Sequence, residues 1–178
     1  LWEERLEDEI HAGKPVTVSG PSGTHPDPLY LREYEHFLLR KFSPGPGTKS
    51  IRIVLDCANG AASAIAPDVL RGLGFTVIAT EAEPDGRNIN EDCGALHPEK
   101  LAQTVLARRA DIGIAFDGDA DRALWVDHHG RILTGDHTLF VLSRDMEARG
   151  RLRARTVVAT TMTNMGLEKA LAAEGIGL

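Results

Sequence analysis

Three aspartates at alternate positions, Asp117, Asp119 and Asp121, directly follow the apolar run IGIAF at residues 112–116. Carboxylates crowded in this way at a strand end repel one another, so we expect a positive charge to hold them together. Mg²⁺ suits that role because it prefers oxygen ligands and keeps coordination positions for water or phosphate. The next residue, Arg122, supplies a planar, permanently charged group that matches phosphoryl oxygens. A metal ion and an arginine beside a strand end predict phosphoryl-transfer chemistry.

Two other interpretations of this acidic loop, residues 117–122, remain open. The first is a solvated acidic turn, although alternate aspartates directly after a buried strand are unusual for a surface loop. The second is a calcium loop, which also places oxygens at its first, third and fifth positions. Such a loop needs glycine at its sixth position and glutamate at its twelfth, where this chain has Arg122 and His128.

The elements around the acidic loop alternate between strand and helix. Strands are expected at residues 51–55, 75–79, 111–116, 123–126, 131–133 and 156–160, and helices at residues 63–73, 98–109, 135–149 and 164–174. This order predicts an α/β fold with a mostly parallel sheet covered by helices. In such sheets the ligand crevice lies outside the C-terminal strand ends, where the acidic loop falls. Asn59 and Gly60 also follow a strand end, so we expect them to shape a loop near the site.

The composition restricts the classes of protein. Hydrophobic residues make up 42% of the 178 residues, charged residues 26%, and the formal net charge is −6. These values are typical of a soluble globular protein and argue against a nucleic-acid binder, which normally carries a basic face. No apolar run approaches the roughly 20 residues that cross a bilayer, so no membrane partner is expected. Cys57 and Cys93 are expected to be reduced thiols in a cytoplasmic protein.

Two segments near the start of the chain lie outside the alternating pattern. A turn-rich stretch at residues 13–28 includes SGTHP at residues 22–26, which has the composition of a phosphate-binding loop but the position of a flexible linker. A helix is expected at residues 29–42, and the proline-rich residues 43–47 mark a domain boundary. The chain starts without methionine inside an acidic helix, so we expect a piece of a longer protein, truncated at both ends.

Several motifs in one order resemble a known family. Residues 117–122 (DGDADR) resemble the metal-binding loop of the α-D-phosphohexomutases. Residues 56–62 (DCANGAA), 85–90 (DGRNIN) and 93–99 (CGALHPE) resemble the phosphoglucosamine mutase branch of that family. Residues 160–166 (TTMTNMG) resemble the opening of the family's third domain.

The resemblance implies an enzyme that interconverts glucosamine 6-phosphate and glucosamine 1-phosphate through a phosphoserine and a bisphosphate intermediate. It implies that Asp117, Asp119 and Asp121 bind Mg²⁺, that Arg122 contacts the phosphate, and that the partner is a phosphorylated hexosamine. A phosphomannomutase or phosphoglucomutase, and a non-catalytic Mg²⁺-binding module of the same fold, remain alternatives. The sequence does not give the oligomeric state.

The resemblance also implies a domain division, because the family arranges four domains around one cleft. Residues 1–28 would be the remnant of the first domain with its linker, residues 29–153 the second domain, and residues 154–178 the start of the third. The family's nucleophilic serine loop precedes the second domain and is absent from this chain. We therefore expect the chain alone to be inactive.

Overall fold

The computed structural model describes residues 2–13, 28–42 and 47–178. The linker motif at residues 22–26 and the proline-rich residues 43–46 lie outside the described residues. In chain order the elements are α1 (Trp2–His11), α2 (Pro28–Lys41), η1 (Thr48–Ser50), β1 (Arg52–Asp56), η2 (Ala61–Ala64), α3 (Ala66–Gly72), β2 (Thr76–Thr80), η3 (Gly94–Leu96), α4 (Pro98–Arg108), β3 (Ile112–Phe116), β4 (Ala123–Asp127), β5 (Ile132–Leu133), α5 (Gly135–Ala148), η4 (Arg153–Arg155) and α6 (Met165–Ala173).

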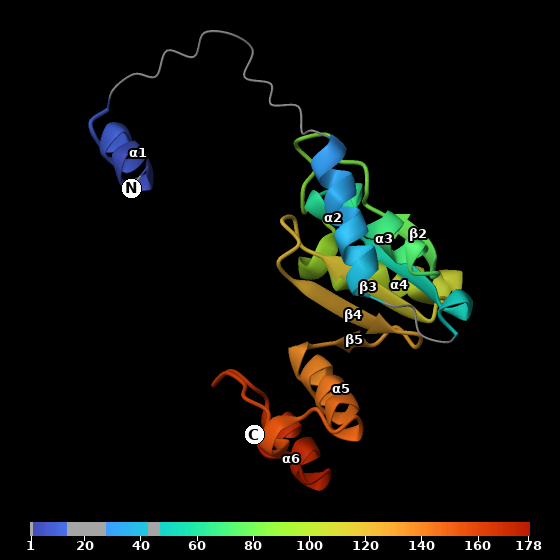
Figure 1. Cartoon of the computed structure of the whole chain (residues 1–178). Coiled ribbons are helices and arrows are strands. Elements are labelled where there is room, and N and C mark those ends of the chain that lie inside the picture. Colours follow the sequence, from blue (N-terminus) through green and yellow to red (C-terminus); the bar gives the residue numbers. More distant parts are fainter. Residues whose placement is uncertain (1, 14–27, 43–46) are drawn as a thin grey trace.

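The strands form one five-stranded sheet in the order β2-β1-β3-β4-β5 (Figure 1). β1 runs parallel to both β2 and β3, whereas β3 with β4 and β4 with β5 are antiparallel. The expected α/β class is confirmed, and the sheet combines a parallel half with an antiparallel half. Because β1, β2 and β3 point the same way, the loops that follow them meet at one edge of the sheet.

Helix α4 covers one face of the sheet. Val54, Ala115 and Val126 point to this face from β1, β3 and β4, and they pack with Leu101 and Val105 of α4 in one buried cluster. The alternation of side chains along a strand brings these positions to the same side. A strand pattern and a helical pattern in the sequence therefore meet in a single core.

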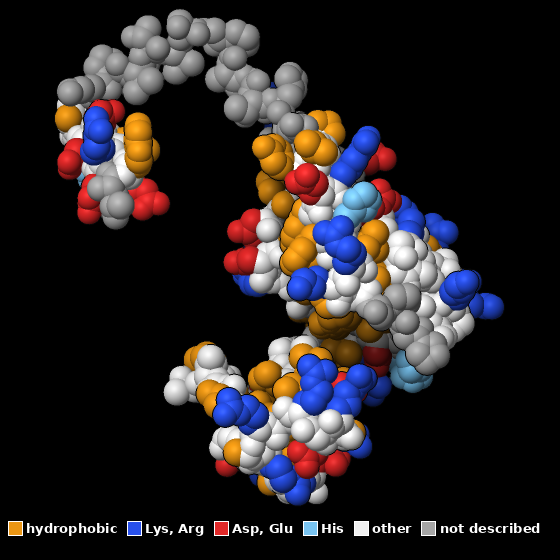
Figure 2. All heavy atoms as spheres, viewed as in Figure 1, with side chains coloured by type: hydrophobic (Ala, Val, Ile, Leu, Met, Phe, Trp, Pro, Cys, Tyr) orange, Lys and Arg blue, Asp and Glu red, His pale blue; other side chains and the backbone are white. Residues whose placement is uncertain are grey.

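Helix α3 covers the opposite face. Ile53, Leu55 and Ile114 are buried there with Ala62 of η2, and Leu70 of α3 packs against them. Helix α2 lies outside α3 and contacts it. Hydrophobic side chains gather along α2 in Figure 2, and none of the α2 residues is buried. Tyr34 and Phe37 of α2 are about half exposed.

Two sequence expectations change in the structure. The helix expected at residues 63–73 is split into η2 and α3 at Ile65, because Pro67 lacks an N–H and fits only the first turn of a new helix. The strand expected at residues 156–160 is reduced to a single parallel bridge between Thr156 and Gly177. Val157, Leu167 and Leu171 then form a separate small core beneath α5.

None of the helices in residues 2–13, 28–42 and 47–178 combines the length and the apolar character that crossing a membrane requires.

The hairpin between β4 and β5 depends on one carboxyl group. Asp127 Oδ1 accepts hydrogen bonds from the backbone N–H groups of His129 and Arg131, both at 2.9 Å. Its Oδ2 lies 2.6 Å from Arg131 Nε. Burial raises the pKa of Asp127, but the hydrogen bonds from Arg131 and His129 outweigh it and lower the pKa to about 2. The ionised carboxylate therefore fixes the turn.

We expect Asp127→Asn to be less stable than the wild type at neutral pH, with a difference that shrinks in acid. A carboxyl group with a lowered folded-state pKa contributes stability above its ordinary pKa of 3.8, and that stability is lost as the pH falls through about 2. Urea unfolding between about pH 7 and about pH 3 measures the difference. Asp145→Asn, which removes an exposed pair with Arg149, should change the free energy of unfolding by less than about 1 kcal/mol. A difference that stays constant down to about pH 3 would contradict this account.

Candidate metal and phosphate site

The acidic loop turns directly from β3 into β4. Asp117 follows the last β3 residue, and its carbonyl accepts the Ala120 N–H at 3.1 Å. Ala120 has the left-handed φ of 60° that such a tight turn requires. One carboxylate oxygen from each of Asp117, Asp119 and Asp121 lies within 4.8 Å of the others. The structure therefore brings together the three aspartates singled out from the sequence.

These carboxylate oxygens fit a small, hard cation. An octahedral Mg²⁺ with bonds of about 2.0–2.1 Å separates its ligand oxygens by about 3–4 Å. Small rotations of the exposed side chains would bring the spread of up to 4.8 Å into that range. Asp117 is 2% exposed and held by Arg122, whereas Asp119 and Asp121 are exposed. The loop thus offers one buried and two exposed carboxylates.

Arg122 lies at the same loop and holds Asp117. Its backbone N–H donates to Asp117 Oδ1 at 3.0 Å and its Nε donates to Asp117 Oδ2 at 2.7 Å. The Nε atom is also 3.4 Å from Asp121 Oδ1. The Arg122 side chain is 67% exposed. A guanidinium anchored in this way at the surface keeps polar edges that can face a phosphate.

The pKa values of two of the aspartates are displaced in opposite directions. Burial raises the pKa of Asp117, but hydrogen bonds from Arg122 and from the Asp121 carboxyl group outweigh it and lower the pKa. The pKa of Asp121 is raised by its hydrogen bond to Asp117 and by the negative charges of Asp119 and Asp117. One arginine therefore does not offset the repulsion among three carboxylates, and a divalent cation would.

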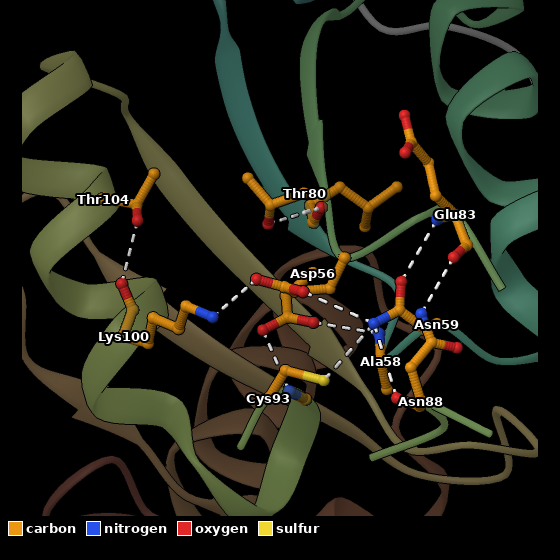
Figure 3. Close-up of polar contacts among 12 residues, drawn as sticks. Asp56, Ala58, Asn59, Thr80, Glu83, Asn88, Cys93, Lys100 and Thr104 are labelled. Atoms are coloured by element: carbon orange, nitrogen blue, oxygen red, sulfur yellow. Dashed lines mark hydrogen bonds and ion pairs between the residues drawn. The ribbon is translucent and has the colours of Figure 1, made fainter. Parts of the chain in front are cut away.

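A buried carboxyl group, Asp56, supports the loop that follows β1 (Figure 3). Its Oδ1 accepts the Ala58 N–H and its Oδ2 accepts the Gly94 N–H, both at 2.9 Å. Burial raises the pKa of Asp56, and these two hydrogen bonds partly counter the rise. Asp56 thereby ties the loop after β1 to the segment that precedes α4.

Asn59 connects the same loop to the one after β2 (Figure 3). Its buried side chain accepts the Glu83 N–H at 3.1 Å and donates to Glu81 Oε2 at 3.4 Å. Glu81 in turn pairs with Lys100 of α4 at 2.6 Å. Of these residues, sequence reasoning named only Asn59, because the contacts join segments that are distant along the chain. The signal that could have revealed Asp56 is an aspartate at the end of a buried strand.

Cys57 and Cys93 are buried beside this network. Burial, with the negative charge of Asp56, raises the pKa of Cys57 to about 12 and that of Cys93 to about 11. Both thiols therefore stay protonated at neutral pH, and neither is a nucleophile.

Two apolar hollows lie along α5 rather than at the acidic loop. One, of about 530 Å³, lies between α5 and α6 and is lined by residues such as Phe140 and Leu167. The other, of about 300 Å³, lies between α5 and the sheet and includes Trp125 and Val141. At the acidic loop itself, Asp119, Asp121 and Arg122 are exposed.

Comparisons with known proteins show the family and the fold. The family model "Phosphoglucomutase/phosphomannomutase, alpha/beta/alpha domain II" matches residues 31–130, and the model for domain III of the same family matches residues 134–178. A phosphoglucosamine mutase from Caldanaerobacter subterraneus subsp. tengcongensis is 45% identical over 99% of this chain and 40% of its own length. One from Pseudomonas syringae pv. syringae is 53% identical over 71% of this chain and 28% of its own length. The chain thus spans less than half the length of these curated relatives.

Among solved structures, a phosphoglucomutase/phosphomannomutase family protein from Burkholderia thailandensis superposes with a TM-score of 0.71. It is 23% identical, and the match covers 98% of this chain and 37% of that protein. At this identity the likeness shows the fold.

We expect Asp56→Ala to destabilise the chain, since it leaves the Ala58 and Gly94 N–H groups buried without their acceptor. Each unpaired buried donor costs about 1–3 kcal/mol, so the free energy of unfolding should fall by at least that amount. Urea unfolding at neutral pH measures it. The matched control is Asp68→Ala, because Asp68 is exposed and pairs with exposed Arg71. If the two variants were equally stable, Asp56 would not be what holds the loop.

Proposed function

The chain belongs to the phosphoglucomutase/phosphomannomutase family, and from that premise we propose that it is part of a phosphoglucosamine mutase. The whole enzyme would interconvert glucosamine 6-phosphate and glucosamine 1-phosphate. Relatives that are 45–53% identical are named phosphoglucosamine mutase, which supports glucosamine phosphate as the substrate. The observation that carries the chemistry is the convergence of three aspartate oxygens beside Arg122, at the edge where the parallel strands end.

In this proposal Asp117, Asp119 and Asp121 would hold Mg²⁺. When bound, the ion supplies positive charge that neutralises a phosphoryl group and orients it for in-line transfer. Asp117 would be the fixed ligand because it is buried and accepts hydrogen bonds from Arg122, and the exposed Asp119 and Asp121 would be the other two ligands. Oxygen ligands that are already fixed at a strand end need little rearrangement when negative charge develops on the phosphoryl group in the transition state.

Arg122 is proposed to contact the phosphate. Asp117 holds the Nε edge of its guanidinium, so the remaining N–H groups have a restricted set of directions. Phosphoryl transfer depends mainly on positioning and on charge neutralisation at the equatorial oxygens, and an oriented arginine provides both. Arg122 is therefore assigned to binding and orienting the phosphoryl group rather than to moving a proton.

The other parts of the reaction are proposed to lie in further domains, as the resemblance implies. The phosphoserine and the loop that selects the sugar would come from there, so the chain alone would not turn over substrate. The domain division at residues 28 and 153 and the cytoplasmic location stay predictions.

A different sugar is the second candidate, because the matching family model is named for phosphoglucomutase and phosphomannomutase. Assays of the completed enzyme with glucosamine, glucose and mannose phosphates separate the two. Faster turnover of glucose or mannose phosphate would replace the hexosamine assignment and leave the metal assignment intact.

We expect Asp119→Asn to abolish most of the activity when the missing domains are supplied, for example from the Caldanaerobacter relative, which is 45% identical over 99% of this chain. Removal of one charged ligand should lower kcat by about 10²–10³-fold and raise the Mg²⁺ concentration needed for half-maximal rate. Steady-state assays across a Mg²⁺ series measure both. Asp68→Asn, an exposed substitution on α3, is the control and should have no effect. Turnover by Asp119→Asn at the wild-type rate and Mg²⁺ dependence would remove the metal assignment.

A further inference from the structure

The loop after β1 touches the acidic loop at a point where two glycines meet. The Gly118 carbonyl accepts the Ala61 N–H at 2.8 Å. A Cβ atom added to Gly60 would lie 2.1 Å from that carbonyl oxygen and 2.8 Å from Gly118 Cα. Real Cβ atoms essentially never approach another heavy atom closer than 3.0 Å, so even alanine at position 60 requires one loop to move.

The backbone conformation of Gly60 does not require glycine. Its φ of −113° and ψ of −157° are extended values that any residue adopts. At position 60 a side chain is excluded by the nearby Gly118 backbone and not by the backbone angles. This separates Gly60 from Gly94, whose φ of 74° by itself favours glycine.

The other side of Gly118 is also occupied. A Cβ atom added to Gly118 would lie 2.7 Å from Asn90 Nδ2 and 2.7 Å from Ile89 Cδ1. The Asn90 N–H donates to the Ala58 carbonyl at 2.9 Å, which joins this second support to the loop after β1. Gly118 is therefore contacted from both sides by segments that are themselves tied together, so these segments set its position.

The peptide at Gly118 links Asp117 to Asp119, two of the three convergent aspartates. A shift of about 1 Å at Gly118 would relieve the overlap, and it would turn both carboxylates away from their shared centre. Mg²⁺ requires nearly ideal octahedral geometry, and functional sites tolerate displacements of only about 0.5 Å. A methyl group at position 60 should therefore displace the carboxylates of Asp117 and Asp119.

We propose that Gly60 is a positioning residue of the metal site. By having no side chain, it lets the loop after β1 support Gly118 closely and so sets the directions of Asp117 and Asp119. This role rests on the proposed function, since it concerns the same aspartates, but it assigns a residue outside the acidic loop.

The rival account is that Gly60 serves the stability of the fold alone. Gly113 in β3 offers the comparison, because a Cβ there would lie 2.6 Å from Val105 Cγ2 and 3.0 Å from Leu101 Cδ1 in the core. Gly113→Ala should disturb the packing of α4 without touching the acidic loop. Gly135→Ala is the neutral control, since nothing lies within 4 Å of an added Cβ.

The test measures Mn²⁺ binding to the 178-residue chain by electron paramagnetic resonance, with Mg²⁺ competition, beside thermal unfolding of each variant. Gly60→Ala should weaken Mn²⁺ binding by about 10–100-fold, the usual effect of losing a residue that orients ligands. Gly135→Ala should bind like the wild type. Gly113→Ala should lower Tm and keep its Mn²⁺ affinity at temperatures below its transition.

Each other outcome contradicts a defined claim. If Gly60→Ala bound Mn²⁺ as the wild type does, or if Gly113→Ala weakened binding equally, the positioning role would be wrong and the metal site would stand. If the wild type showed no saturable binding, the three aspartates would not hold the ion by themselves, and the positioning role that rests on them would be wrong. Should Gly60→Ala not fold, Asn90→Ala replaces it, since it removes atoms from the other side of Gly118. It should also weaken Mn²⁺ binding, and unchanged binding would overturn the proposal.

Discussion

The parallel pairing of β1 with β2 and β3 is the constraint on which the candidate site depends. In this register Asp56 lies opposite Thr80 on one side and Ala115 on the other. The three loops that follow therefore begin side by side at one edge. Had β3 run antiparallel to β1, the acidic loop would lie at the opposite edge, away from Asn59 and Gly60. The direction of the strands thus places the acidic loop beside the loop that contains Asn59 and Gly60.

Two carboxyl groups, Asp56 and Asp117, are buried at that edge, and different interactions offset the unfavourable burial of their charge. Asp56 accepts backbone N–H groups and is shielded from solvent, so its surroundings replace water with fixed dipoles. Asp117 is equally buried but faces Arg122 and two exposed carboxylates. Burial opposes charge at both positions, yet the pKa of Asp56 is raised and that of Asp117 is lowered. The balance differs because a permanent cation contacts only Asp117.

The grouping of the candidate site residues could be predicted from the sequence, since it depends on side-chain type and short spacing. Three alternate aspartates and an adjacent arginine are close in space in almost any turn, so their convergence needed no knowledge of the fold. The strand and helix alternation likewise follows from local periodicity. The network of Asn59, Glu81 and Lys100 could not be predicted in this way. Its members belong to three different segments, and their contact depends on how β1, β2 and α4 pack.

The sequence places Gly60 in a loop near the site, but it does not predict the contact of Gly60 with Gly118, because that contact depends on glycine's lack of a side chain. An aspartate shows by its identity what it can bind, whereas Gly60 matters through the space that it leaves for Gly118. Gly113 leaves similar space for Leu101 and Val105, and there the beneficiary is the core rather than the site. The same residue type thus leaves space for core packing at one strand position and, in our proposal, for the support of the acidic loop at a loop position. Only the neighbours, which the fold supplies, distinguish the two.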